Sequence, residues 1–159
     1  MTQQTRRLMT FPDAVAAVLD RPYRLGGTIR GEDCISLLFR IYPPCGASIP
    51  EEHNGWTITN YAVRYAAGED GVGEALRGWL ESLGQPVDPA YMIDGDLIIL
   101  RQPETPTGRV PAIYTGSGHA LIVSEEHGVV VVPYRAIEDR VESIRRILPI
   151  LPPPEAGRA

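Results

Sequence analysis

Cys34 is the side chain of this sequence best suited to act as a nucleophile. The apolar residues from Ile35 to Ile41 recur at helical spacing, which predicts a helix that begins at the cysteine, with Asp33 as its N-cap. A thiol on the first turn of a helix faces unpaired backbone N–H groups and the positive end of the helix dipole. Both effects favour the thiolate, which is the nucleophilic form. The sequence therefore predicts a reactive thiol at position 34.

The segment before the cysteine supplies a turn and an aromatic hydroxyl. Gly26, Gly27 and Gly31 leave the backbone free to turn, and Tyr23 lies eleven residues before Cys34. The Tyr23 hydroxyl is a candidate for stabilising an oxyanion, or it packs with its hydroxyl bonded to the backbone. Cys34 has a simpler interpretation too, as a small buried apolar residue.

A thiol nucleophile needs a base, and the sequence contains three histidines. His53 lies in the polar segment EEHNGW, and His127 lies at the tip of a predicted hairpin, so both are expected to be solvated. His119 begins a predicted strand, GHALIV, directly after a flexible loop. His119 is therefore the candidate base, and the alternative is a half-buried strand histidine.

Other combinations of reactive residues are weaker. Cys34, Cys45 and His53 match no common zinc spacing, and a disulfide between the two cysteines would consume the proposed nucleophile. No pair of carboxylates is arranged for acid–base chemistry. We therefore expect neither a metal nor a cofactor.

Composition limits the class of protein. The chain has 159 residues, which suits one domain with its own core. A net charge of −5 argues against nucleic acid as the main partner. No apolar run has membrane-spanning length and no signal-peptide core is evident, so we expect synthesis in the cytoplasm without a signal peptide.

The first half of the chain is predicted to be helical. Residues 1–9 are expected to form a flexible arm, 10–150 a single domain, and 151–159 a Pro-rich tail. A short helix is predicted from Thr10 to near Asp20, and Pro43-Pro44 should end the Cys34 helix. Residues 45–90 have helical rather than strand character, with an amphipathic helix around 75–83 and a weaker one over 57–67.

The second half is predicted to be β. Residues 96–101 form a strand, and 102–117 are expected to be a long loop rich in Pro, Gly and Thr. Residues 118–124 and 129–132 are predicted to pair as a hairpin, and 141–150 supply a further strand. Helices followed by antiparallel strands indicate an α+β fold.

The order of these motifs resembles NlpC-type cysteine peptidases, a papain-like family that cuts peptidoglycan stem peptides. PYRLGG followed by EDC resembles the family's Tyr and Asp-Cys segments, GDLIIL its Gly-Asp strand, and GHALIV its histidine strand. The match extends over about residues 11–150. It implies N-terminal helices packed on a small antiparallel sheet, with Cys34 as nucleophile, His119 as base and Tyr23 near the oxyanion.

The middle section resembles the short single-domain versions associated with phage or phage-like tails. This resemblance implies a peptidoglycan peptide substrate, tail or hub proteins as partners, and a place in the virion tail, acting at the cell wall. A papain-like acyltransferase or deamidating enzyme would share the same nucleophile.

One departure from the family favours another function. The family usually has a third polar residue on the second strand of the hairpin, where it orients the base. Val129–Val132 offer no polar side chain there, although a backbone carbonyl, Tyr134 or a nearby acid could substitute. The alternative function is a catalytically degenerate structural subunit of a tail tip or hub that keeps the fold.

Overall fold

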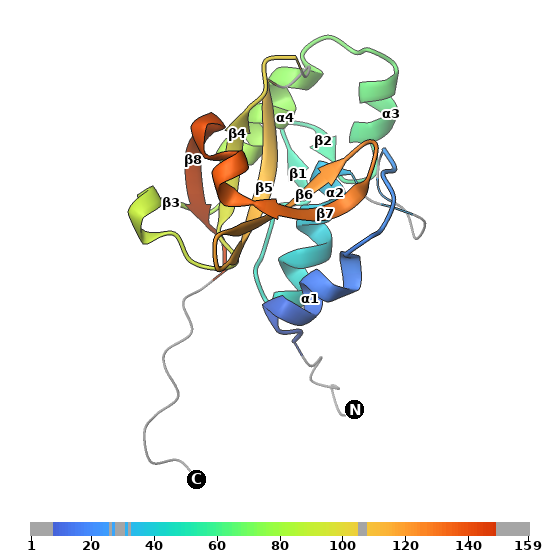
Figure 1. The fold of residues 1–159 in the computed structure, drawn as a ribbon. Helices are drawn as coiled ribbons and strands as arrows, with labels where there is room; N and C mark the ends of the chain where they lie inside the picture. The colour runs from blue at the N-terminus through green and yellow to red at the C-terminus, as the bar shows by residue number, and fades with distance from the viewer. Residues whose placement is uncertain (1–7, 26, 28–30, 32, 105–107, 149–159) are drawn as a thin grey trace, which may run out of the picture.

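The computed structural model describes residues 8–25, 27, 31, 33–104 and 108–148 (Figure 1). Most of the expected N-terminal arm, Gly26 of the glycine turn and the tail 151–159 lie outside the described residues. The helices of the described chain are α1 (Phe11–Val18), α2 (Cys34–Ile41), α3 (Tyr61–Ala66) and α4 (Val72–Glu81), with 3₁₀ turns η1 (Pro43–Cys45), η2 (Pro89–Tyr91), η3 (Tyr134–Ala136) and η4 (Glu138–Arg140). The strands are β1 (Glu52–His53), β2 (Trp56–Thr57), β3 (Gln85–Val87), β4 (Leu97–Arg101), β5 (Arg109–Gly116), β6 (His119–Ser124), β7 (Gly128–Pro133) and β8 (Val141–Arg146).

Both N-terminal helices begin where the sequence places a cap. The Thr10 hydroxyl accepts a hydrogen bond from the Asp13 amide at 3.2 Å, and Asp33 caps α2 in a full capping box with Ser36. These side chains satisfy amide groups that lack a partner in the first turn of a helix. The predicted helix start at Cys34 is confirmed.

The strands form one antiparallel sheet in the order β3-β8-β4-β5-β6-β7, beside a separate two-stranded pair, β1-β2. β6 and β7 form the predicted hairpin, with Leu121 opposite Val131. β8 was predicted as a further strand, and it lies between β3 and β4 rather than at an edge. The α+β prediction is confirmed.

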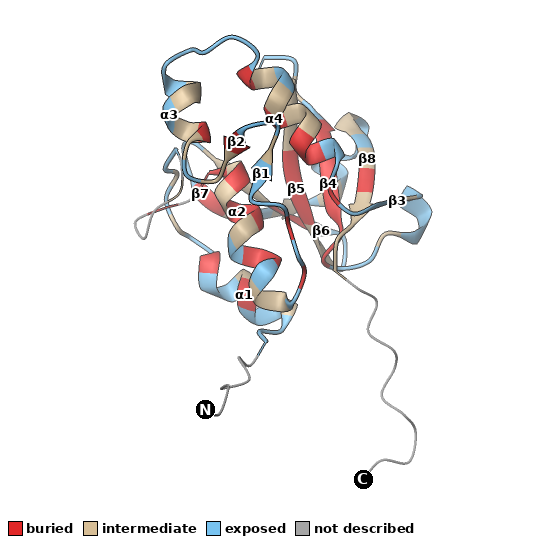
Figure 2. Ribbon diagram, turned by 180° about the vertical axis from the view of Figure 1, so that it is seen from behind, coloured by how far each residue is buried: buried red, intermediate tan, exposed pale blue. Residues whose placement is uncertain are grey.

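The sheet has a hydrophobic core on each face. Helices α1, α2 and α4 cover one face, where their apolar side chains pack on Leu97, Ile113 and Leu121 (Figure 2). The other face packs Ile98, Leu100 and Ala112 against Ile137, which lies between η3 and η4. Alternate residues of one strand point to opposite faces, so β4 contributes to both cores.

Two expectations are corrected. The segment 102–117 is not one long loop, because β5 occupies half of it and pairs with both β4 and β6. Its Pro, Gly and Thr content concealed a strand whose stability comes from its neighbours. Likewise, residues 45–90 contain the short strands β1, β2 and β3 in addition to the helices.

The chain before α2 closes the free edge of β7. The Asp20 amide donates to the Val129 carbonyl at 2.9 Å, and the Val129 amide donates to the Arg21 carbonyl at 2.8 Å. Gly128 lies so close to Arg21 that a Cβ atom would be 2.0 Å from the Arg21 carbonyl oxygen. This contact carries the chain toward Tyr23 and the start of α2.

Candidate active site

The start of α2 is held in place by a buried carboxylate. Asp33 is 3% exposed, and its Oδ1 accepts from the amides of Ile35 at 3.0 Å and Ser36 at 2.7 Å. The hydroxyl of Tyr61, from α3, donates to Asp33 Oδ2 at 2.6 Å. The side chain next to the thiol is therefore fixed from two elements.

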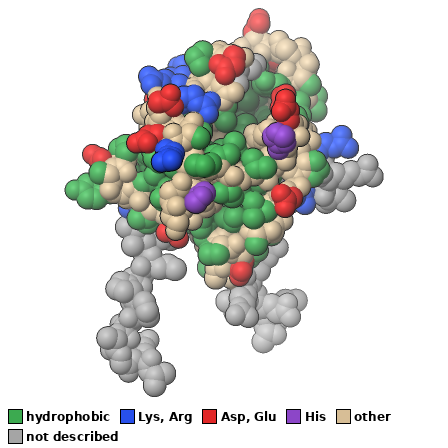
Figure 3. Space-filling model, viewed as in Figure 1, with side chains coloured by type: hydrophobic (Ala, Val, Ile, Leu, Met, Phe, Trp, Pro, Cys, Tyr) green, Lys and Arg blue, Asp and Glu red, His purple; other side chains and the backbone are tan. Residues whose placement is uncertain are grey.

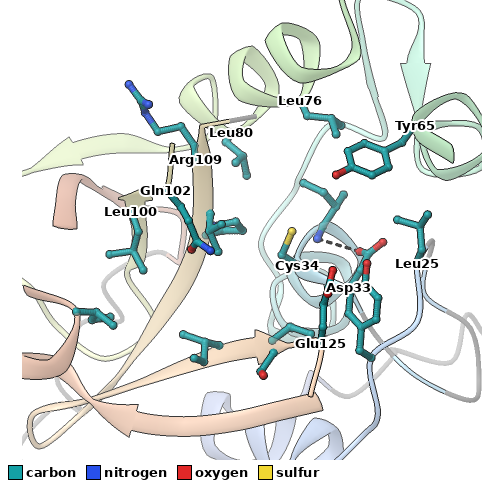
Figure 4. Close-up of a pocket in the computed structure, with 18 of the residues that line it drawn as sticks. Leu25, Asp33, Cys34, Tyr65, Leu76, Leu80, Leu100, Gln102, Arg109 and Glu125 are labelled. Atoms are coloured by element: carbon teal, nitrogen blue, oxygen red, sulfur yellow. Dashed lines mark hydrogen bonds between the residues drawn. The ribbon is translucent and has the colours of Figure 1, made fainter. Parts of the chain in front are cut away.

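Cys34 lines a cleft of about 490 Å³ between the helices and one end of the sheet (Figure 4). That end is formed by the last residues of β4, the first of β5 and the last of β6, which meet because the strands are antiparallel. The lining residues are Tyr23, Leu25, Asp33, Cys34, Ile35, Tyr61, Tyr65, Leu76, Leu80, Leu100, Gln102, Arg109, Val110, Pro111, Ile122, Val123, Ser124, Glu125, Glu126, Ile137 and Arg140.

The protein environment opposes ionisation of the thiol. Burial raises the pKa of Cys34, and the negative charge of Asp33 raises it further, to about 12. The amides of Cys34 and Ile35 act in the opposite direction, as the sequence predicts, but their effect is smaller. The expected thiolate is thus corrected, because desolvation outweighs the helix N-terminus at this position.

Two tyrosines lie close to the thiol. Burial raises the pKa of Tyr23, and so do the charges of Glu125, Asp33 and Cys34. Burial also raises the pKa of Tyr65, followed by the charges of Cys34 and Glu125. Tyr23 and Cys34 therefore line the same cleft. Tyr65 and Glu125, which the sequence did not single out, line it too (Figure 4).

The wall that the sheet presents to the cleft is largely apolar. Its apolar residues are Leu100 of β4, Val110 and Pro111 at the start of β5, and Ile122 and Val123 near the end of β6. Arg109 and Ser124 are its polar residues. The described β5–β6 pairing begins at Ile113 and Leu121. Because proline lacks an N–H, Pro111 cannot donate a hydrogen bond that would extend this ladder, and the cleft opens beside it.

His119 lies at the opposite end of β6 from the cleft. It pairs with Gly116 and Pro133, is exposed, and is not among the described residues that line the cleft. Val123 of β6 lines the cleft instead. It lies four residues after His119, which corresponds to roughly 13 Å of strand. The Cys34–His119 pair stays a prediction, and the described cleft lining does not support it because Ile122 and Val123 of β6 line the cleft instead of His119.

One ring nitrogen of His119 lies next to a backbone carbonyl oxygen. Its Nδ1 lies 2.9 Å from the Ser117 carbonyl oxygen, so a backbone carbonyl can orient the ring without a third polar side chain. The alternative from the sequence was a half-buried strand histidine. The strand is present, but the His119 side chain is exposed.

The other two histidines are also away from the cleft lining. His53 lies in β1 near α4, where its Nε2 is 3.3 Å from the Asn54 side-chain amide. His127 is exposed in the β6–β7 turn, 3.6 Å from Glu126. All three histidines of the sequence are described, and none lines the Cys34 cleft.

No described residues form a candidate metal site. Within the described ranges, no three His, Cys, Asp or Glu side chains are grouped as metal ligands would be. Cys34, the first residue of α2, and Cys45, the last residue of η1, are both free thiols. The described helices are all too short or too polar to cross a membrane.

Sequence reasoning missed Tyr65, Glu125 and Arg140 as cleft residues. Tyr65 belongs to α3, which was predicted only as a weak helix, and Glu125 follows a hairpin strand in what looked like a solvated turn. Arg140 lies in a 3₁₀ turn almost at the end of the domain. The spacing of these residues in the chain gives no signal that they meet.

The NlpC/P60 family model matches residues 20–145 of the sequence, which is most of the chain. This chain belongs to the NlpC/P60 family. The matched range contains the whole sheet except the last residue of β8, together with α2 and all the cleft residues. No curated protein matches the sequence.

Solved structures of NlpC/P60 proteins have the same fold. A family protein from Bacillus cereus is 21% identical with a TM-score of 0.61, and the alignment covers 90% of this chain but only 42% of that one. The NlpC/P60 domain of the peptidoglycan hydrolase SagA is 19% identical with a TM-score of 0.56, over 86% of this chain and 95% of that one.

A third neighbour is RipD from Mycobacterium tuberculosis, described as a non-catalytic NlpC/P60 domain protein adapted to peptidoglycan binding. It is 22% identical with a TM-score of 0.51, and the alignment covers 88% of this chain and 99% of that chain. Catalytic and non-catalytic proteins thus share the fold of this NlpC/P60 domain.

Proposed function

We propose that this NlpC/P60 domain binds peptidoglycan stem peptides in the Cys34 cleft without cleaving them. One observation carries the proposal: the thiol and three tyrosines line the cleft, while none of the three histidines lines it. A domain of this kind retains a peptide-sized groove and lacks the base that the reaction needs.

The chemistry supports binding over hydrolysis. Burial and the charge of Asp33 raise the pKa of the thiol far above 7, so the thiol is protonated at neutral pH. A base beside the thiol would compensate by taking its proton during attack, but the facing wall is largely apolar, with Val110, Pro111, Ile122 and Val123. The negative charge of Asp33 next to the thiol further disfavours a thiolate.

The family supplies the ligand class. SagA is a peptidoglycan hydrolase, and RipD is a non-catalytic family protein adapted to peptidoglycan binding. A cleft of about 490 Å³ that is lined by apolar and aromatic side chains suits a short peptide. The RipD example supports a peptidoglycan-binding role for a domain whose base is missing.

A cysteine peptidase or amidase is the second candidate, because Cys34 and Tyr23 do share the cleft. In that mechanism Cys34 attacks an amide carbonyl, Tyr23 and the first amides of α2 hold the oxyanion, and a base accepts the thiol proton. His119 would be that base only after a rearrangement of β6 that carries it along the sheet.

The deciding experiment compares wild type with Cys34→Ala on purified peptidoglycan. We expect neither protein to release stem peptides above background, and both to bind a soluble stem tetrapeptide with similar affinity in calorimetry. Release by wild type that is abolished in Cys34→Ala would overturn the binding-only proposal and establish the peptidase. No binding by either protein would also contradict it.

A matched pair of tyrosine variants tests whether the cleft is the binding site. Tyr65→Ala removes an aromatic side chain from the cleft, whereas Tyr91→Ala removes one that is 74% exposed on η2. We expect Tyr65→Ala to weaken binding and Tyr91→Ala to leave it unchanged. Equal affinities in the two variants would place the peptide elsewhere.

We further propose, from the likeness of the middle section to phage-tail members, that the domain is a subunit of a phage-like tail tip or hub and acts at the cell wall. A binding-only domain suits such a role because it would attach the particle to peptidoglycan. Deletion should abolish particle assembly or attachment, while Cys34→Ala should leave infectivity intact. A loss of infectivity confined to Cys34→Ala would contradict the purely structural role.

A further inference from the structure

The two ends of the cleft differ in charge. Asp33 and Glu125 lie at the end that contains Cys34, and Gln102 and Arg109 lie at the other (Figure 4). Arg140 lies beside Gln102, with its Nη1 3.5 Å from the Gln102 Oε1. Leu80 and Leu100 are among the apolar side chains of the cleft. The space-filling view shows hydrophobic side chains gathered between a cluster of basic groups and the acidic tip of the β6–β7 hairpin (Figure 3). A ligand that fills the cleft therefore meets opposite charges at its two ends.

Arg109 is already neutralised by a partner. Its Nη2 donates to Glu142 Oε1 at 2.6 Å across β5 and β8, and its Nε also contacts the Glu142 carboxylate. A bidentate arrangement of this kind uses the guanidinium group and its counter-ion together. Arg109 thus contributes to the wall of the cleft more than to its charge.

Arg140 is different, because no carboxylate of the described residues pairs with it. The side chain is half-buried, and its Nη1 lies 3.5 Å from Gln102 Oε1, at the limit of a hydrogen bond. Its neighbours Glu138 and Asp139 are exposed on the same turn, and Glu142 is held by Arg109. The guanidinium group therefore reaches the cleft with its charge uncompensated.

The surroundings of Arg140 strengthen its attraction for an anion. Leu100, Ile122 and Ile137 line the cleft and belong to one cluster of packed apolar side chains. A guanidinium group near apolar surface is incompletely solvated, and a carboxylate matches its planar pair of donors. The Gln102 side chain lies next to this guanidinium group, at the same end of the cleft.

We propose that Arg140 and Gln102 form a carboxylate subsite, so that the peptide lies across the cleft with a carboxylate at Arg140. Its apolar groups pack along Leu80, Leu100 and Ile122, and its cationic group approaches Glu125. This inference rests on the proposed peptide binding and assigns the direction of the peptide. It also makes Arg140 a residue that selects peptides with a free carboxylate.

The test uses the stem tetrapeptide L-Ala-γ-D-Glu-L-Lys-D-Ala and its two singly amidated forms, one at the glutamate carboxylate and one at the C-terminus. Calorimetry with wild type should show that one of the two amidations weakens binding about tenfold, as expected for the loss of a charged hydrogen bond. The carboxylate whose amidation matters is the one that Arg140 holds.

Three arginine variants locate the effect. Arg140→Gln should weaken binding of the free acid about tenfold and abolish the discrimination between acid and amide. Arg140→Lys keeps the charge but not the planar pair of donors, so it should retain part of the discrimination between acid and amide. Arg135→Gln, on the exposed turn next to η4, should behave as wild type.

The possible failures are distinguishable. If wild type binds all three peptides equally, or if Arg140→Gln still discriminates between them, the carboxylate subsite is wrong while peptide binding stands. If wild type binds none of the peptides, peptide binding itself is overturned, and the subsite with it. Matching thermal unfolding curves for the variants show that they are folded.

Discussion

Cys34 illustrates how one side chain responds to opposing electrostatic effects. The first amides of α2 stabilise its thiolate, which is the reason that a helix start predicts a reactive cysteine. Burial and the adjacent carboxylate of Asp33 act against them and are stronger. The same Asp33 that caps the helix and positions the thiol therefore also suppresses its ionisation.

Asp33→Asn should lower the pKa of the Cys34 thiol. Removing the negative charge favours the thiolate, while an asparagine still caps the helix and burial still opposes ionisation. We expect the pKa to fall from about 12 but to stay above 9, the ordinary value. The pH dependence of iodoacetamide alkylation measures this, with Cys45→Ala as background so that one thiol reports.

His119→Ala in the same background is the control for the base. His119 lies at the end of β6 opposite the cleft. We therefore expect the pH profile of Cys34 alkylation to be the same in the His119→Ala/Cys45→Ala protein as in the Cys45→Ala protein. A profile shifted upward in His119→Ala would show that the imidazole does interact with the thiol in solution. An unchanged pKa in Asp33→Asn would contradict the role of the carboxylate.

At the scale of elements, α3 completes the site although it is only six residues long. Tyr61 is 2% exposed and donates its hydroxyl to Asp33, and Tyr65 lies one turn further on in the cleft. A short helix of this kind has little stability of its own. Its contact with Asp33 joins the middle section to the start of α2.

Tyr61→Phe should destabilise the fold by about 1–3 kcal/mol, because the mutation removes a hydrogen bond to a buried carboxylate. Tyr91→Phe is the matched control, since Tyr91 is 74% exposed and should change the free energy of unfolding by less than about 0.5 kcal/mol. Urea unfolding followed by circular dichroism gives both values. Equal stability of the two variants would show that the Tyr61 contact is not a stabilising one.

At the scale of the whole molecule, a buried ion pair joins the sheet to the connection between β3 and β4. Asp96 is 2% exposed, and Arg146 of β8 donates to both of its oxygens, at 3.0 and 2.9 Å. The Asp96 carboxylate also accepts from the Ile93 amide at 2.9 Å, and Arg146 reaches the Tyr91 carbonyl. The Gly-Asp motif of the sequence thus has a structural role next to β4.

Asp96→Asn should destabilise the domain by roughly 3 kcal/mol, because Arg146 would lose its counter-ion while most of its surface stays covered. Glu142→Gln is the comparison, since that carboxylate is more exposed and its pair with Arg109 should contribute at most about 1 kcal/mol. Chemical denaturation of both variants tests the difference. A smaller loss in Asp96→Asn than in Glu142→Gln would contradict this ranking.

The sequence by itself determined those features that depend on nearby residues. Asp33 and Cys34 mark a helix start because capping involves the next three residues, and the hairpin from 118 to 132 follows from alternation and a polar turn. The α+β class and the family resemblance also follow from the order of such local motifs. Both are confirmed.

Only the tertiary structure decided what surrounds the thiol. β5 is a strand because β4 and β6 pair with it, which its Pro, Gly and Thr content does not reveal. The direction of β6 places Val123 at the cleft and His119 at the other end, and the packing of α2 determines that burial outweighs the helix dipole at Cys34. Distances between chain segments and the local dielectric environment are properties of the packed molecule, and spacing along the sequence does not encode them directly.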